Sequence, residues 1–284
     1  MPVYLMYAEG DHGWILDAHL CSERKDMIVW IVPEDGHVFS YQEQWNPSLQ
    51  VSGLVSDLEM LIEWLHQPEI KMKFGILNHL FEHKRLELGL VDQTRVLTVE
   101  VKGHTSLKQL AQHIEERGQH VRFTLYSVDL QPEQSYLTSK RLSIGSSVMI
   151  ENQQLVAMEQ EVKRRSLRCC RFEIEFCKNK GFADSSTVIS SVSIGECDAE
   201  GKRFGRSFMI HSHHPSFAKK LGQCLRELDP DVIFTQDGNT LALPALMTHV
   251  KKTEQTLKLG RNTSVLRQIG VSRTVHSYGQ VLRS

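Results

Sequence analysis

The chain has 284 residues, of which 40% are hydrophobic and 24% charged, and these values are typical of a globular protein with one large domain or two ordinary ones. The formal net charge of −1 excludes no class of partner, since a nucleic-acid-binding protein needs a basic face and not a basic total. The six cysteines form no C-x-x-C pair, no signal-peptide pattern opens the chain, and no apolar run approaches the roughly 20 residues of a membrane helix. We therefore expect a cytoplasmic protein with free thiols and no membrane partner, associated with the nucleoid if the source is prokaryotic.

The first fifty residues predict strands and turns. Apolar runs at residues 3–10, 13–21 and 27–39 are separated by turn residues such as Asp11 and Gly36. This opening is β-rich.

Two helices are expected next. Apolar residues recur at helical spacing after Ser56, and they do so again between Ile76 and Leu86 after a break near Pro68.

A strand, a helix and further strands follow. Residues 95–101 predict a strand, and residues 106–109 have the capping-box form that begins a helix ending at Gly118. Residues 120–151 are again β-rich, and a polar, helix-like segment at 158–166 leads to a new apolar run.

The pattern changes near residues 155–168, where we place a domain boundary. The expected domains are a β-rich one at 1–160 and a second one at 161–284. In the second domain strands come first and then alternate with helices, which predicts helices packed on a mixed sheet within an α/β layer. The fold class of the whole chain is α+β.

Two carboxylates mark the first strand of the second domain. Glu173 and Glu175 stand at i and i+2, so a strand would place both on one face and Phe172 and Ile174 on the other. Paired acids on one face can hold hard cations such as Mg²⁺. A solvated strand face with the same alternation is the alternative.

A second segment, residues 229–244, carries an apolar strand into a turn. The turn contains Asp237, Gly238 and Asn239, and a helix is predicted to begin near Pro244. Strand ends of this kind are where α/β sheets place their sites.

These two segments resemble the 3′–5′ exonuclease domain of family B DNA polymerases, which has an RNase H-like fold. The family's first exonuclease motif is a Phe-Asp-Ile-Glu strand, which Arg171–Phe176 resembles, with Glu173 in the Asp position and Glu175 in the Glu position. The second motif reads Asp-Pro-Asp-Ile-Ile-x-x-Tyr-Asn-Gly-x-x-Phe-Asp-Leu-Pro, and residues 229–244 follow it throughout.

Two further stretches are similar to the same family. Residues 125–137 resemble an N-terminal stretch in which Val-Asp-Ile-Pro leads to Tyr-Leu, and residues 277–280 resemble its Ser-Tyr-Gly-Arg. The resemblance thus implies a family B polymerase N-terminal domain at 1–160 and an exonuclease-like domain at 161–284 that is incomplete at its end.

The working residues of the second motif differ from the family pattern. Gln236 stands for Tyr, Asp237 for Asn and Leu241 for Phe, while Ala242 stands where the family has a metal-binding Asp. Two-metal phosphodiester cleavage needs a cluster of carboxylates around both ions, and a methyl group cannot bind a cation.

The resemblance therefore implies a degenerate site. Glu173 and Glu175 occupy its catalytic and metal positions, and Mg²⁺ or Mn²⁺ is the expected cofactor if any activity or binding remains. The third exonuclease motif and the polymerase domain, with its own metal-binding aspartates, are expected to lie outside these residues.

DNA, as a single strand or a primer-template, is the implied partner, together with the remainder of a polymerase chain or a partner subunit. The DNA-binding candidates are Phe172, Asp237, Asn239, Leu241, Lys251 and Lys252. From residue 251 to 284 there are seven Lys and Arg against one Glu, and such a segment can follow a phosphate backbone. A solvated helix and loop is the alternative for this segment.

Two other functions stay open. The first is an active 3′–5′ exonuclease in which Glu173, Glu175 and Asp237 hold the metals, and the second is a protein-interaction scaffold that does not bind DNA. Histidines at 211, 213 and 214, and the pair at 79 and 83 on a predicted helix, suggest metal clips. Neither set has the partners that complete four ligands, so a loop and an ordinary helix face are the expected structures.

Overall fold

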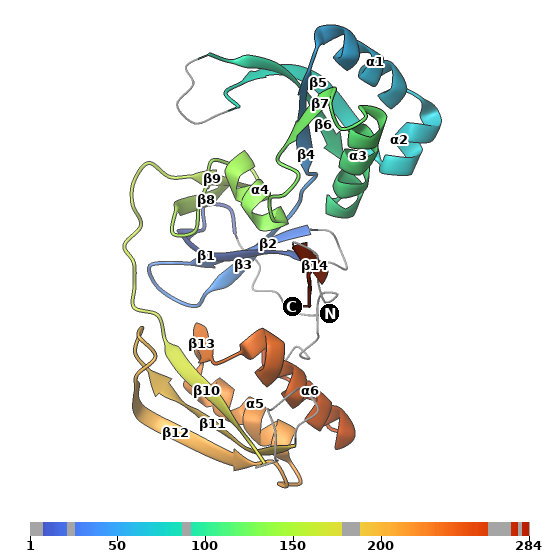
Figure 1. The fold of residues 1–284 in the computed structure, drawn as a ribbon. Helices are drawn as coiled ribbons and strands as arrows, with labels where there is room; N and C mark the ends of the chain where they lie inside the picture. Colours follow the sequence, from blue (N-terminus) through green and yellow to red (C-terminus); the bar gives the residue numbers. More distant parts are fainter. Residues whose placement is uncertain are drawn as a thin grey trace. The chain divides into compact units, whose positions relative to one another are not determined.

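The computed structural model describes residues 8–21, 26–86, 92–177, 188–260, 274–277 and 280–283, without the side chains of Asn239 and of the residues after 260 (Figure 1). Helices and several mostly antiparallel sheets make up these residues, which is the α+β class expected from the sequence. They divide into two compact units. The amino-terminal unit holds residues 8–33 and Phe39–Val162, and the carboxy-terminal unit holds Glu34–Val38 and the residues from Lys163 onward. No described helix is long and apolar enough to cross a membrane.

A five-stranded antiparallel sheet forms one part of the amino-terminal unit, in the order β3-β2-β1-β8-β9. Its strands are β1 (His12–Cys21), β2 (Asp26–Val32), β3 (Phe39–Gln44), β8 (Ser147–Glu151) and β9 (Gln154–Ala157). Helix α4 (Pro132–Ser139) packs on it, and Tyr136 of α4 shares a core with Ile15, Val29 and Val148 of the strands.

A four-stranded antiparallel sheet with three helices forms the other part, in the order β5-β6-β4-β7 (Figure 1). Its elements are β4 (Ser48–Gly53), α1 (Val55–Leu65), α2 (Pro68–Phe74), β5 (Ile76–Lys84), β6 (Thr94–Val101), α3 (His104–Arg117) and β7 (Phe123–Tyr126). The helices cover one sheet face, where Val51, Leu97 and Val99 meet Leu61 and Leu110.

The helix predicted between Ile76 and Leu86 is wrong, because residues 76–84 form β5. Pro68 does not break a helix but occupies the first turn of α2, a position where its missing N–H costs nothing. Gly75 then ends α2 in the left-handed region at φ 61°. Pairing of eight residues of β5 with β6 prevails over a short apolar pattern that matched helical spacing.

Two smaller expectations are also corrected. Helix α3 begins at His104 after Gly103, so Ser106 does not cap it. Residues 158–166 form no helix. Two of their backbone N–H groups bond to side chains instead, that of Val162 to Ser147 Oγ at 2.9 Å and that of Lys163 to Glu34 Oε1 at 3.0 Å.

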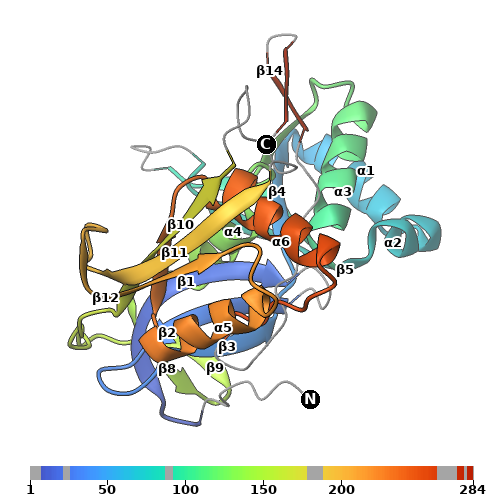
Figure 2. The same cartoon turned by 90° about the horizontal axis from the view of Figure 1, so that it is seen from below.

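The carboxy-terminal unit contains the mixed sheet that the sequence predicts, in the order β12-β11-β10-β13. Strand β10 (Cys169–Phe176) pairs antiparallel with β11 (Ile189–Cys197) and parallel with β13 (Val232–Thr235), and β12 (Arg203–His211) pairs antiparallel with β11. Helices α5 (Phe217–Leu228) and α6 (Leu243–Lys252) lie on one face of the sheet (Figure 2). We call the opposite face the open face.

A short hairpin of β14 (Thr274–Ser277) and β15 (Gln280–Arg283) follows. Tyr278 and Gly279 lie outside the described residues, as do Arg261, Arg267 and Arg273 of the basic segment. The expectations that rest on them stay predictions.

A half-buried carboxylate, that of Glu43, ties α4 to the five-stranded sheet. Glu43 Oε2 accepts hydrogen bonds from the hydroxyls of Tyr41 at 3.0 Å and Tyr136 at 2.8 Å, and Glu43 Oε1 accepts one from Lys140 Nζ at 2.6 Å. Burial and the neighbouring Glu43 raise the pKa of the Tyr136 hydroxyl far above its usual value, so this group remains a donor.

We expect Tyr136→Phe to lower the free energy of unfolding by about 1–2 kcal/mol, because it removes one donor from a largely buried carboxylate. Urea unfolding followed by circular dichroism measures this change. Tyr126→Phe, at a half-buried tyrosine of β7, is the matched control and is expected to change stability by less than about 0.5 kcal/mol. Equal losses in the two variants would contradict the role given to Glu43.

Candidate functional site

The carboxylates of β10 share the open face, as the i, i+2 spacing predicts. Phe172 faces the helices, where it is 2% exposed, and Ile174 packs against the same core. Glu173 stands opposite Ser193 of β11 in the strand register, and Glu175 stands opposite Ser191. Phe172 is thus a core residue of β10, and its assignment as a DNA contact stays a prediction.

Glu173 is held between two arginines. Its Oε1 lies 2.5 Å from Arg171 Nε, two residues earlier on β10, and its Oε2 lies 2.8 Å from Arg203 Nη2 on β12. Arg203 Nη2 also donates to Ser193 Oγ, and Arg171 Nη1 donates to Gly201 O at 3.2 Å. Both oxygens of the carboxylate therefore face guanidinium groups.

Glu175 has a different partner. Its Oε2 accepts a hydrogen bond of 2.6 Å from the hydroxyl of Ser191, a buried residue on β11. A serine donor on the neighbouring strand satisfies this oxygen without supplying positive charge.

The second predicted segment lies at the same edge of the sheet. Because β10 and β13 run parallel, with Phe172 opposite Thr235, the residues that follow β13 lie beside the second half of β10. Asp237 is exposed and adopts a left-handed conformation at φ 49°. It begins a π-helical turn, Gly238–Ala242.

The turn leads directly into α6. The backbone N–H groups of Leu241 and Ala242 both donate to Asp237 O, at 2.8 and 3.0 Å. At Gly238 an added Cβ would lie 2.6 Å from Thr235 Cγ2, so any other residue would have to displace the Thr235 side chain. The strand, turn and helix near Pro244 agree with the sequence prediction.

The residues present do not fit a two-metal centre. Ala242 is 3% exposed and offers a methyl group, and both oxygens of Glu173 are occupied by arginines. Within the described ranges, no three His, Cys, Asp or Glu side chains lie close enough together to hold a metal ion. The metal and catalytic assignments of Glu173 and Glu175 stay predictions.

The remaining candidates lie apart from these carboxylates. Lys251 and Lys252 are exposed at the far end of α6 from Ala242, roughly 13 Å along the axis at 1.5 Å per residue. Leu241 is half-buried, and the side chain of Asn239 lies outside the described residues.

The histidine clips are not formed. His79 and His83 lie on strand β5 and not on a helix. His211 stacks on His213 with their ring centroids 5.5 Å apart, and His214 Nδ1 accepts the Ser216 N–H at 3.0 Å.

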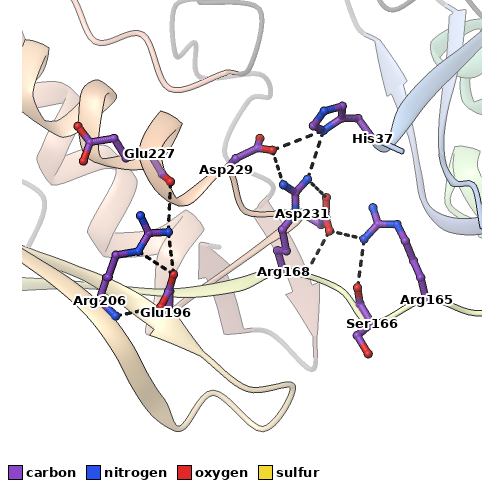
Figure 3. Close-up of polar contacts among 9 residues, drawn as sticks. All are labelled: His37, Arg165, Ser166, Arg168, Glu196, Arg206, Glu227, Asp229 and Asp231. Atoms are coloured by element: carbon purple, nitrogen blue, oxygen red, sulfur yellow. Dashed lines mark hydrogen bonds and ion pairs between the residues drawn. The ribbon is translucent and has the colours of Figure 1, made fainter. Parts of the chain in front are cut away.

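An ion-pair network at the start of the 229–244 segment was not predicted from the sequence. Asp231 has a side chain with 0% exposure, and its Oδ2 accepts from Arg165 Nη1 at 2.8 Å and from the backbone N–H of Arg168 at 3.0 Å (Figure 3). Asp229 Oδ2 lies 2.6 Å from Arg168 Nη1 and 3.4 Å from His37 Nδ1.

This network fixes the register of one strand and accounts for two of the arginines that precede β10. The backbone of Arg168 also accepts the N–H groups of Asp231 and Val232, at 2.7 and 3.2 Å, so the side-chain contacts fix the register in which β13 joins β10. Arg165 and Arg168 belong to a cluster of five basic residues between 163 and 171, and both are engaged in holding the sheet together. The signal available in the sequence was the pairing of this cluster with the acids at 229 and 231.

A second ion pair lies on the helix side of the same sheet. Arg206 of β12 contacts Glu196 Oε1 at 2.9 Å and donates to the carbonyl of Glu227 on α5 at 3.5 Å (Figure 3). These contacts place Arg206 on the face opposite Glu173.

The amino-terminal unit has a small hollow on its own open sheet face. Its volume is about 130 Å³, below the roughly 300–1,000 Å³ of ligand pockets. It is lined by Asn46, Ser48, Asn78, Leu80, Thr98 and Glu100.

Comparisons with known proteins give a likeness in fold. No family model matches the sequence, and a search of curated proteins finds no match. Among solved structures, the family B DNA polymerase from the hyperthermophilic archaeon Pyrobaculum calidifontis matches with a TM-score of 0.67 and 16% sequence identity. The match covers 95% of this chain and 35% of that polymerase chain. The chain thus shares the fold of about a third of a family B DNA polymerase.

We expect Asp231→Asn to lower the free energy of unfolding by about 2–4 kcal/mol, because it removes the buried charge that pairs with the half-buried Arg165. Denaturant titration measures the loss. The same change at the half-exposed Asp229 is the matched comparison and is expected to cost less, since solvent screens that pair. A larger loss at Asp229 than at Asp231 would refute this account of the network.

Proposed function

We propose that the chain is a DNA-binding or structural module of a family B DNA polymerase, acting in replication or repair, in which the exonuclease site is degenerate. Its fold likeness to such a polymerase supports the class. The observation that carries the proposal is the state of the site itself, where Ala242 offers no ligand and Glu173 is neutralised by Arg171 and Arg203.

The chemistry of cleavage supports the loss of nuclease activity. Two ions about 3.5–4 Å apart must stabilise both the attacking and the leaving oxygen. Glu in place of Asp at 173 lengthens the arm by one carbon, and a misplacement of about 1 Å can cost on the order of 10²-fold in rate. The missing metal ligand at Ala242 would lower the cleavage rate further.

DNA is the proposed partner, as a single strand or a primer-template, and the remainder of a polymerase chain or a separate subunit would supply the rest of the machinery. Asp237, Lys251 and Lys252 are exposed and remain candidates for contact with DNA.

An active exonuclease is a second candidate, and one observation favours it. Asp237 is exposed and follows β13, beside the second half of β10, which carries Glu175. It is therefore a possible replacement for the missing carboxylate. Mg²⁺ or Mn²⁺ would then be held by Glu173, Glu175 and Asp237, and Arg171 and Arg203 would have to release Glu173.

An assay with 5′-labelled single-stranded DNA and a primer-template tests the nuclease part of the proposal. With Mg²⁺ or Mn²⁺ the chain is expected to leave both substrates at full length, and Glu175→Ala is expected to behave identically. Shortening from the 3′ end that disappears in Glu175→Ala would establish the exonuclease instead. Failure of the chain to show salt-sensitive binding to either DNA would favour a protein-interaction scaffold.

A further inference from the structure

Arg171 and Arg203, the two arginines that contact Glu173, have N–H donors beyond those used in these contacts. A guanidinium group carries five N–H donors in a planar fork. Among the described residues, Arg171 and Arg203 each contact Glu173 and donate to one further acceptor. The side chains of Arg171 and Arg203 are 46% and 37% exposed. Donors therefore remain for an acceptor that approaches from solvent.

Glu173 acts as a support for these two groups. It joins Arg171 of β10 to Arg203 of β12 across the intervening strand β11. Two positive charges against one carboxylate leave an excess of +1 in this trio. Guanidinium groups held by a carboxylate are well suited to phosphate, because their fixed forks match its oxygens.

Apolar side chains stand beside the arginines on the open face. Phe234 of β13 is opposite Arg171 in the strand register, and Met209 of β12 is in the same row as Glu173. They are 37% and 61% exposed. Gly195 is opposite Arg171 on the other side and adds no side chain there.

This combination fits a single nucleic-acid strand. Proteins that bind single strands without sequence preference combine basic groups for the backbone with exposed aromatic side chains for the bases. The positive charges next to Glu173 are the guanidinium groups of Arg171 and Arg203. The sequence resemblance implies a metal ion at the same position.

We propose that Arg171 and Arg203, supported by Glu173, bind a phosphodiester group of single-stranded DNA on the open face, so that binding there requires no divalent metal. This inference rests on the proposed function, since it names the groups through which the module would hold DNA. Phe234 is the stacking platform for a neighbouring base.

Binding of a fluorescent oligothymidylate to the whole chain, followed by anisotropy at several salt concentrations, tests this inference. The chain is expected to bind equally well, within about twofold, in Mg²⁺ and in EDTA. Arg171→Gln and Arg203→Gln are each expected to weaken binding and to reduce the slope of log K against log salt by about 0.7, the value for one phosphate contact on a single strand.

Arg206→Gln is the matched control. It removes the same charge from the same sheet, but Arg206 lies on the helix side with Glu196 and Glu227, so its salt slope is expected to equal that of the parent chain. Thermal melting of all three variants confirms that they are folded. If one site variant does not fold, the other decides.

The outcomes separate the two proposals. Binding that EDTA abolishes, or that both site variants retain in full, would overturn the role of the arginines and leave the DNA-binding module standing. An equal loss in all three variants would also overturn it, because it would indicate general attraction to a basic surface. No binding by the parent chain would remove the DNA-binding function itself.

Discussion

The carboxy-terminal unit depends on the position of β10 between an antiparallel and a parallel neighbour. The buried contact between Asp231 and Arg165, together with the backbone pairing of Arg168, fixes β13 against the start of β10. Side chains alternate along a strand, so this register sends Phe172 into the core and Glu173 to the open face. The arginine contacts of Glu173 then follow from the paired strands.

The segment from Asp229 to Pro244 keeps its backbone framework although Ala242 offers no metal ligand. Strand, turn and helix follow one another from Asp229 to Pro244 as the family motif implies, and the absence of a side chain at Gly238 leaves room for Thr235. The framework depends on packing and backbone geometry, and the small, buried side chain of Ala242 is compatible with both. The chemistry depends on ligand charge, which Ala242 cannot supply.

Much of this arrangement is predictable from the sequence, and the exceptions share a physical cause. Spacing along one strand correctly places Glu173 and Glu175 on one face, because a period of two residues is a local property. Arg203 is thirty residues away from Glu173, and no local pattern indicates that it reaches the same carboxylate. The helix predicted between Ile76 and Leu86 is wrong for the same reason, since the pairing of β5 with β6 is a long-range contact.

The central claim is that guanidinium groups, and not a divalent ion, neutralise Glu173. Titration of the chain with Mn²⁺, followed by electron paramagnetic resonance of the free ion, tests this claim most directly. The account predicts no stoichiometric binding at micromolar Mn²⁺, with the same free-ion signal for Glu173→Gln. Binding of one or two Mn²⁺ ions per chain that Glu173→Gln abolishes would contradict it.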